Sequence, residues 1–436
     1  MRWILYNVVL FLAMIVTLPH YYLKMKRRGG YRKNFGDRFG RYSAETREKI
    51  GDGGAILIHA VSVGEVGVAD QFMRAMREKN PGQRFVLSTT SSTGWKEAVK
   101  RLPPEDVVIY NPLDLPGFVK RALDVIRPSA FIMVETEIWP NLIRECKRRD
   151  IPMCIINGRL SDRTAPTYRK LRFIFGPALR CIKMLQVQSA LDEERFIAVG
   201  ADPSTMLVTG SFKFDVARRN PEKEEMAAKL LRALDFSDGH RILMGASTWA
   251  GEEKLLAESY LALRAKYTDL RLVLVPRHME RAAEVCAEIR SLGLRPVRKS
   301  DLDAGREATA PLGRDDVFVV DTTGEIMGFF PYAAVCVVGR TFCSGGGQNM
   351  IEPCLCGVPT IVGPLTQNFR PVMADLLSAE AIVQVPSATS LQPELDRLLG
   401  DASACAALGA RAEKAVLSRR GAVNRCVTAV SDAIGL

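Results

Sequence analysis

Residues 55–79 read AILIHAVSVGEVGVADQFMRAMREK, and this stretch decides the fold class. An apolar run at 55–61 is followed at once by a helical pattern over 65–79. The run is continuously apolar and does not alternate with polar residues, which is typical of a strand buried on both faces of a parallel sheet. We therefore expect an α/β protein whose helices cover both faces of a parallel sheet.

The same alternation of apolar runs and helical stretches continues along the chain in two series. Further strands of the first series are expected at 84–90, 107–110, 130–134, 153–157, 184–188 and 206–209. A polar break at 215–226 separates them from a second series, expected at 241–245, 272–276, 317–321, 335–339, 360–362 and 382–385, with a loop at 300–314. The pattern predicts two Rossmann-like, doubly wound domains with a ligand site between them.

We place the domain boundaries by these two series. The predicted parts are an anchor at 1–24, a first domain at 25–212, a second domain at 213–420, and a C-terminal helix at 421–436 that returns to the first domain.

Composition and charge narrow the function classes. Of 436 residues, 47% are hydrophobic and 25% charged, which are globular proportions that exclude a disordered chain. The net charge is +11, and residues 24–42 alone contribute +7. Because the excess lies beside the N-terminus and not along a folded domain, it favours anionic lipid or a phosphorylated substrate over nucleic acid. Ten scattered cysteines without a CxxC pair and only four histidines predict no metal site.

An uncharged run at 3–23 has the length of a membrane-spanning helix. Six positive residues follow it within ten positions: Lys24, Lys26, Arg27, Arg28, Arg32 and Lys33. This distribution predicts a single N-terminal anchor with the rest of the chain on the cytoplasmic side. The alternative, a buried core helix, stays open because Asn7 and Pro19 weaken the span.

Acidic residues follow two of the expected strands of the first domain. Glu65 follows the first strand, where a carboxylate can accept a proton from an incoming hydroxyl. Ser62 three residues earlier also makes a capping box with Glu65, and on position alone the cap is the simpler interpretation. Glu135 and Glu137 follow the strand at 130–134, either as site acids or as charges at a helix N-terminus.

Two further segments are candidates for binding anions. Residues 159–183 carry a net charge of +6, so this segment is either a phosphate-binding surface or a solvated helix face. In the second half, SGGGQNMIEP at 344–353 is a glycine-rich loop opening a helix beyond a strand, an arrangement that suits phosphate.

These motifs together resemble the 3-deoxy-D-manno-octulosonic acid (Kdo) transferase family of lipopolysaccharide synthesis. The resemblance runs through seven motifs in order, HAVSVGE (59–65), ETEIWPNLI (135–143), NGRLSDR (157–163), GSFKFD (210–215), PRH (276–278), DTTGEI (321–326) and GGGQNMIEP (345–353). It implies a GT-B-like glycosyltransferase, inverting and independent of metal or cofactor. Such an enzyme moves Kdo from CMP-Kdo to a lipid A precursor, lipid IVA, at the cytoplasmic face of the inner membrane.

The resemblance also implies roles for individual residues. Glu65 matches the family's proton acceptor, and Glu135 and Lys213 match its transition-state stabilisers. The residues that match its CMP contacts are Pro276, Arg277, Thr323, Gly324, Glu325, Asn349, Met350, Ile351 and Glu352. For the phosphates of the acceptor we expect contacts from Arg159, Ser161 and Arg163. Two alternatives stay open: a related lipid-acceptor transferase that uses a UDP-sugar, and a non-catalytic, membrane-tethered nucleotide-binding module.

Overall fold

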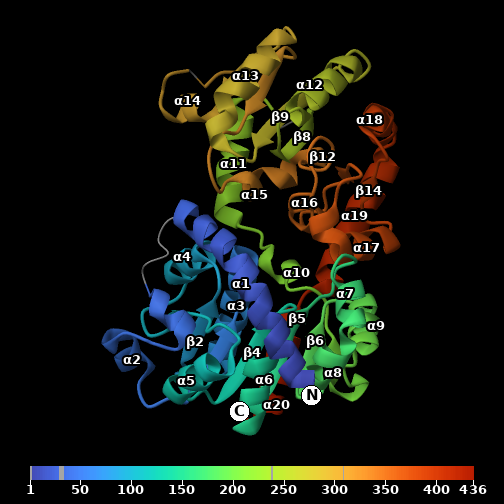
Figure 1. Cartoon of the computed structure of the whole chain (residues 1–436). Coiled ribbons are helices and arrows are strands. Elements are labelled where there is room, and N and C mark those ends of the chain that lie inside the picture. Colours follow the sequence, from blue (N-terminus) through green and yellow to red (C-terminus); the bar gives the residue numbers. More distant parts are fainter. Residues whose placement is uncertain (1, 29–33, 237–238, 308) are drawn as a thin grey trace. The chain divides into compact units, whose positions relative to one another are not determined.

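The computed structural model describes residues 2–28, 34–236, 239–307 and 309–436, without the side chains of residues 2, 5 and 18–28. The chain forms two compact units: unit 1 comprises the residues up to Phe212 together with Gly421–Leu436, and unit 2 comprises Lys213–Arg420. Each unit is built on one parallel sheet, with its elements labelled in Figure 1.

The sheet of unit 1 has seven strands in the order β3-β2-β1-β4-β5-β6-β7. Their bounds are β1 Ile56–His59, β2 Phe85–Thr89, β3 Val107–Tyr110, β4 Ala130–Val134, β5 Met153–Gly158, β6 Met184–Val187 and β7 Met206–Val208. The helices are α1 Arg2–Arg28, α2 Ala44–Ile50, α3 Val63–Lys79, α4 Ser92–Arg101, α5 Pro116–Ile126, α6 Pro140–Arg148, α7 Ala165–Lys170, α8 Arg172–Leu179, α9 Ala190–Val199 and α20 Ala422–Ile434.

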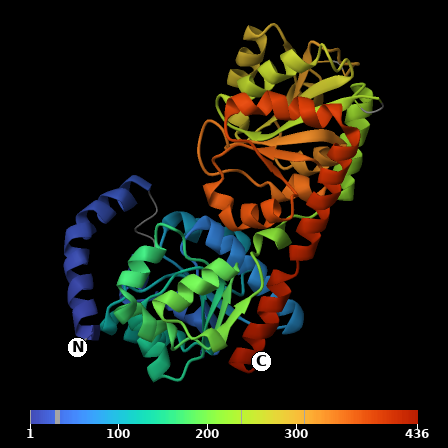
Figure 2. The ribbon, with the colours of Figure 1, turned by 90° about the vertical axis from the view of Figure 1, so that its right-hand side faces the viewer.

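Successive side chains of a strand point to opposite faces of the sheet, so the apolar strands of unit 1 supply two cores. Leu57 packs in a core with side chains of α5, α6 and α9. Its neighbours Ile56 and Ile58 pack on the other face with α3, α4 and the C-terminal helix α20. Figure 2 shows this red helix alongside the elements of unit 1. The continuous apolar runs of the sequence follow from burial on both faces.

Unit 2 repeats this plan with the strand order β10-β11-β9-β8-β12-β13-β14. Its strands are β8 Arg241–Thr248, β9 Leu270–Pro276, β10 Arg295–Arg298, β11 Asp316–Val319, β12 Ala333–Val338, β13 Thr360–Val362 and β14 Val383–Gln384. Its helices are α10 Lys213–Val216, α11 Pro221–Ala233, α12 Glu252–Leu263, α13 Ala282–Ser291, α14 Lys299–Asp303, α15 Ile326–Phe329, α16 Ile351–Leu355, α17 Arg370–Ser378, α18 Leu391–Gly400 and α19 Ala402–Arg419. The prediction of two parallel-sheet α/β domains is confirmed.

The sequence-based expectation for 300–314 was wrong at its start. Residues 300–303 belong to α14, in which Lys299 and Asp303 form an i,i+4 ion pair at 2.6 Å. The strand just before it, β10, was not expected at all. It pairs with β11 at the edge of the sheet, and its first residue, Arg295, forms an ion pair with Asp316 at 2.6 Å. A short edge strand with charged ends lacks the continuous apolar run that marked the other strands.

The predicted membrane anchor is not supported by the structure. Within the part of the chain that is described, no helix is both long and apolar enough to cross a membrane. Helix α1 instead packs, near its start, on other elements of unit 1. The Tyr6 hydroxyl donates to Asp114 Oδ2 at 2.7 Å, and Asn7 Oδ1 accepts from Asn141 Nδ2 at 2.7 Å. Of the six positive residues after the predicted span, Arg32 and Lys33 lie outside the described residues.

Candidate active site

The acidic residues of unit 1 meet where the strand order of its sheet reverses. Strands β1 and β4 are neighbours, and the chain leaves β1 toward β2 on one side and β4 toward β5 on the other. Ligands of such sheets bind beyond the carboxyl ends of the strands at this switch point. Glu65 follows β1, and Glu135 and Glu137 follow β4, so all three carboxylates lie at this edge of the sheet.

Glu65 is held at the start of α3 by bonds to both of its carboxylate oxygens. The backbone N–H of Val61 donates to Oε2 at 2.8 Å, and the Ser62 hydroxyl donates to Oε1 at 2.8 Å. Ser62 Oγ in turn accepts from the N–H of Glu65 at 3.2 Å, as in a capping box. The capping interpretation is therefore confirmed as geometry, and it fixes the carboxylate at the switch point.

The protonation equilibrium of Glu65 is shifted toward neutral pH. Burial raises the pKa of its carboxyl to about 7, and the charges of Glu137 and Glu135 raise it further against the lowering effect of the Val61 and Ser62 bonds. The residue is only 9% exposed, which agrees with burial as the main cause. A carboxyl with a pKa near 7 is matched to general-base work at neutral pH.

The loop after β4 carries backbone strain and a buried histidine contact. Glu135 has φ +59°, a left-handed conformation that non-glycine residues adopt at a cost and that is often found at functional sites. Two residues on, Glu137 Oε2 lies 3.8 Å from Nε2 of His59, which is fully buried. The other ring nitrogen, Nδ1, lies 2.9 Å from Ser88 Oγ. Both acids of the loop are close enough for their charges to raise the pKa of the Glu65 carboxyl.

The candidate acceptor residues lie in the next loop along the sheet. This loop follows β5 and is tied to the Glu135 loop, because the Thr136 hydroxyl donates to the carbonyl of Arg159. Ser161 Oγ is used locally, accepting from the N–H of Thr164 at 3.2 Å. The side chain of Arg163 is exposed and that of Arg159 is half-buried. The structure therefore ties Arg159 to the acidic loop through its backbone, while the Ser161 hydroxyl is already engaged.

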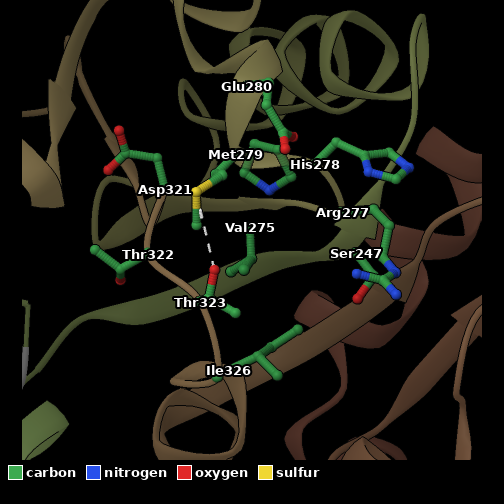
Figure 3. Close-up of a pocket in the computed structure, with 12 residues that line it drawn as sticks. Ser247, Val275, Arg277, His278, Met279, Glu280, Asp321, Thr322, Thr323 and Ile326 are labelled. Carbon is green, nitrogen blue, oxygen red and sulfur yellow. Dashed lines mark hydrogen bonds between the residues drawn. The ribbon is translucent and has the colours of Figure 1, made fainter. Parts of the chain in front are cut away.

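Unit 2 contains a pocket of about 250 Å³ at the carboxyl edge of its sheet. Its walls come from the ends of β8, β9 and β11, as the close-up in Figure 3 shows. Four of the predicted CMP contacts line it: Pro276, Arg277, Thr323 and Gly324. The same view shows Ser247, a residue that the sequence analysis missed, next to Arg277. It stands at the end of β8 with φ +54°.

The remaining predicted CMP contacts do not line this pocket. The Glu325 carboxylate accepts from the Thr322 hydroxyl and lies 3.2 Å from Lys299 Nζ. The side chains of Met350 and Ile351 are fully buried in the core, which leaves only their backbone for a ligand. Glu352 is close enough to Arg277 for the positive charge to oppose the rise that burial causes in its pKa.

Lys213 and Asn349 belong to the surroundings of the glycine-rich loop. Lys213 is the first residue of unit 2, and its Nζ donates to the carbonyl of Asn368 at 2.8 Å. The N–H of Asn368 in turn donates to the carbonyl of Gly346 at 2.9 Å. Asn349 Oδ1 accepts from the N–H of Ile351 at 3.2 Å and so shapes the end of the loop. The lysine therefore reaches the segment that supports the glycine-rich loop.

A metal centre is not apparent among the described residues, where no group of three His, Cys, Asp or Glu side chains is arranged to hold an ion. The one Asp-x-Asp triplet of the sequence, Asp301-Leu302-Asp303, lies on α14. Asp301 pairs with Arg306 at 2.6 Å and Asp303 with Lys299 at 2.6 Å, so both carboxylates have cationic partners.

Comparison with known proteins identifies the family to which this geometry belongs. The sequence model of the family described as 3-deoxy-D-manno-octulosonic-acid transferase (kdotransferase) matches residues 33–216. A 3-deoxy-D-manno-octulosonic acid transferase of Haemophilus influenzae is 31% identical over 400 residues, which cover 91% of this chain and 90% of the relative. The chain belongs to the Kdo transferase family. It is therefore a glycosyltransferase.

A second relative agrees with this assignment, and a solved structure shares the fold. The 3-deoxy-D-manno-octulosonic acid transferase of Bordetella pertussis is 31% identical over 423 residues, or 94% of this chain and 95% of the relative. The crystal structure of a glycosyltransferase from Rickettsia africae aligns with 88% of this chain and 99% of its own, at 13% identity and a TM-score of 0.55. The likeness to that structure shows the GT-B-like fold.

The raised pKa of Glu65 predicts a pH-dependent loss of stability. Because the folded state holds the proton more tightly than the unfolded chain, the contribution of this group is complete below pH 4.5 and is lost as pH rises through about 7. Its size is on the order of 2–3 kcal/mol. We expect Glu65→Gln to remove this decline when the free energy of unfolding is measured against pH. The matched control Glu78→Gln, at an exposed position of the same helix, should retain it; equal slopes in both variants would contradict the prediction.

Proposed function

We propose that this Kdo transferase moves Kdo from CMP-Kdo to a lipid A precursor, lipid IVA, in the synthesis of the lipopolysaccharide inner core. The observation that carries the proposal is the buried carboxyl of Glu65, whose pKa is raised to about 7 at the switch point of unit 1. The pocket at the equivalent edge of unit 2, lined by Arg277, supports a nucleotide-bound donor. The family membership supports the sugar that is transferred.

Glu65 supplies the base for a direct displacement. The deprotonated carboxylate accepts the proton of an acceptor hydroxyl, and the hydroxyl oxygen forms a bond to the anomeric carbon of Kdo. The bond from that carbon to the CMP phosphate breaks at the same time, and the phosphate leaves with the electron pair. One displacement of this kind inverts the configuration at the sugar carbon. Glu135, in its strained conformation, has the place of a residue that stabilises the positive charge developing on the sugar ring.

Basic side chains of unit 2 stand in for a metal ion in this proposal. The leaving group is a single phosphate, and Arg277 in the pocket and Lys213 beside the glycine-rich loop offer positive charge to it. We therefore propose a transferase that needs no cofactor, with CMP-Kdo as a substrate. The backbone of Asn349–Glu352 and Gly324, and not the side chains of Met350, Ile351 or Glu325, is the part suited to contact CMP.

The acceptor is held on unit 1. A lipid A precursor carries two phosphates, and the segment 159–183, with its charge of +6, offers Arg159 next to the acidic loop and the exposed Arg163 four residues further on. Arginine forks bind phosphate with two parallel hydrogen bonds, which suits this pairing.

The product distinguishes the proposal from a related enzyme that uses a UDP-sugar. We expect purified protein with CMP-Kdo and lipid IVA to give a lipid whose mass is increased by one or more Kdo units, measured by mass spectrometry. UDP-sugars in place of CMP-Kdo should give no product. Transfer from a UDP-sugar with none from CMP-Kdo would overturn the donor assignment, and no transfer from either donor would overturn the proposed reaction.

Replacement of the base tests its role directly. We expect Glu65→Gln to lower kcat by a factor of about 10²–10⁴, since an amide cannot accept the proton. In the unchanged protein kcat/KM should rise with pH through about 7, because only the deprotonated carboxylate acts as a base. Binding of CMP, measured by calorimetry, should be unchanged in the variant. Full turnover of Glu65→Gln would leave this residue with its capping role alone.

We further propose that the enzyme works at the cytoplasmic face of the inner membrane, where its lipid acceptor resides. Between residues 4 and 16, helix α1 exposes apolar side chains, among them Val8, Leu12 and Val16. The charge of +7 within 24–42 adds attraction to anionic lipids.

A vesicle experiment tests this surface. We expect the double variant Leu12→Asn/Val16→Asn to bind anionic vesicles several-fold more weakly in a flotation assay, because apolar area on α1 is lost. High salt should weaken the binding of the unchanged protein, because it screens the basic segment. The control Met226→Asn/Leu417→Asn changes apolar residues of unit 2 that are also exposed and should have no effect. Equal loss in both double variants would contradict the assignment of the surface.

A further inference from the structure

Arg340 occupies the switch point of the sheet in unit 2. Strands β8 and β12 are neighbours, and from them the chain proceeds toward opposite edges of the sheet. Arg340 follows β12, directly opposite the end of β8 where Ser247 lines the pocket. Its φ of +59° is left-handed, like those of Ser247 and, at the switch point of unit 1, Glu135. Strain of this kind persists where the surrounding structure enforces it, and it clusters at ligand sites.

The guanidinium of Arg340 is held in a fixed place by its neighbours. Its Cζ lies 4.6 Å from the centroid of the Trp249 ring, a distance at which a cation is attracted to the ring face. On the side of the glycine-rich loop, a Cβ added to Gly346 would lie 3.6 Å from the same Cζ. The guanidinium is thus packed between an indole ring and the backbone of the loop.

The nearby carboxylates do not neutralise this arginine. Glu252 accepts the backbone N–H groups of Trp249, Arg340, Thr341 and Phe342 at 2.7–3.0 Å, which uses both of its oxygens. Glu253 is bound by Arg281 and by the Thr248 hydroxyl, each at 2.9 Å. Among the residues that the structure describes, no carboxylate forms an ion pair with the Arg340 side chain.

One nitrogen of the same side chain lacks a partner. Nε of Arg340 is buried, and no hydrogen-bond acceptor within the described part of the chain reaches it. A buried donor without an acceptor destabilises the folded state, so such a group calls for an explanation in a ligand or a water. Arg340 thus has a strained backbone, a positive charge and an unused Nε–H donor beside a glycine-rich loop. These are the properties of an anion-binding group.

We propose that Arg340 binds an anionic oxygen group of the donor substrate, through the planar fork of its guanidinium. The proposal rests on the proposed function, because the donor CMP-Kdo carries two such groups, the phosphate and the carboxylate of the sugar acid. Both present paired oxygens that match an arginine fork. Arg277 lies at the end of the adjacent strand β9, and its backbone N–H donates to the carbonyl of Thr248 at 3.0 Å. The two arginines thus stand on either side of β8.

Binding of three ligands shows whether Arg340 contacts the phosphate, contacts the sugar carboxylate or only supports the fold. Cytidine lacks both groups, CMP adds the phosphate, and CMP-Kdo adds the sugar carboxylate. We expect Arg340→Gln to raise the KM for CMP-Kdo at least tenfold and to leave the binding of cytidine, measured by calorimetry, unchanged. A parallel loss of CMP affinity would assign Arg340 to the phosphate, whereas unchanged CMP affinity would assign it to the carboxylate. Arg340→Lys, which keeps the charge but not the fork, should recover part of the loss.

A control variant and the unchanged enzyme are measured in the same way, so that the effect of Arg340→Gln can be assigned to its side chain. Arg290→Gln removes one positive charge at an exposed position of α13 and should change none of these values. Unaltered KM and CMP affinity in Arg340→Gln would overturn the proposal, as would an equal weakening of cytidine, which indicates that Arg340 only supports the fold. If the unchanged enzyme fails to turn over CMP-Kdo, the proposed reaction is wrong. In that case the comparison of CMP with cytidine still decides whether Arg340 binds a phosphate.

Discussion

Parallel pairing of strands is the constraint on which both sites depend. Because all strands of a parallel sheet run the same way, every loop that leaves a carboxyl end meets its neighbours at one edge. In unit 1 the neighbours at the reversal of strand order are β1 and β4, which bring Glu65 and Glu135 to that edge. In unit 2 they are β8 and β12, which bring Ser247 and Arg340 there. Residues far apart in the sequence thus converge at one edge of each sheet.

Buried carboxylates at helix starts serve two different purposes in this chain. Glu252 accepts four backbone N–H groups and thereby orders the segment that carries Arg340. Asp114 accepts the N–H groups of Asn141 and Leu142 and orders the start of α6, just after the Glu135 loop. Glu65 has a single backbone donor, and burial together with the charges of Glu137 and Glu135 raises the pKa of its carboxyl. Burial raises the pKa of the Asp114 carboxyl as well, so what distinguishes Glu65 is its place at the switch point beside two further acids.

The sequence predicts the strands well where both faces of the strand are buried, because such a strand is a continuous apolar run, as at 130–134 and 360–362. It fails at β10, an edge strand with charged ends, and at α14, where an ion pair and not an apolar pattern marks the helix. The sequence motifs correctly marked Arg277 and Thr323, which line the pocket. A motif cannot show that the Glu325 carboxylate lies near Lys299 or that the Met350 side chain is buried. Arg340 was missed because a single arginine after a strand carries no pattern; only strand order and its unpartnered nitrogen mark it.

The cap and the base, which compete as interpretations of Glu65 in the sequence, are compatible in the structure. A capping box fixes the carboxylate through the Ser62 hydroxyl and the Val61 N–H, and a base must be fixed to meet its substrate. Those two bonds lower the pKa, yet burial and the acids of the β4 loop outweigh them. The bonds from Ser62 and Val61 therefore fix the position of the Glu65 carboxyl, although they do not lower its pKa below the usual value. A local motif of helix structure can therefore hold the carboxyl in the position that the proposed base requires, with two further acids close to it.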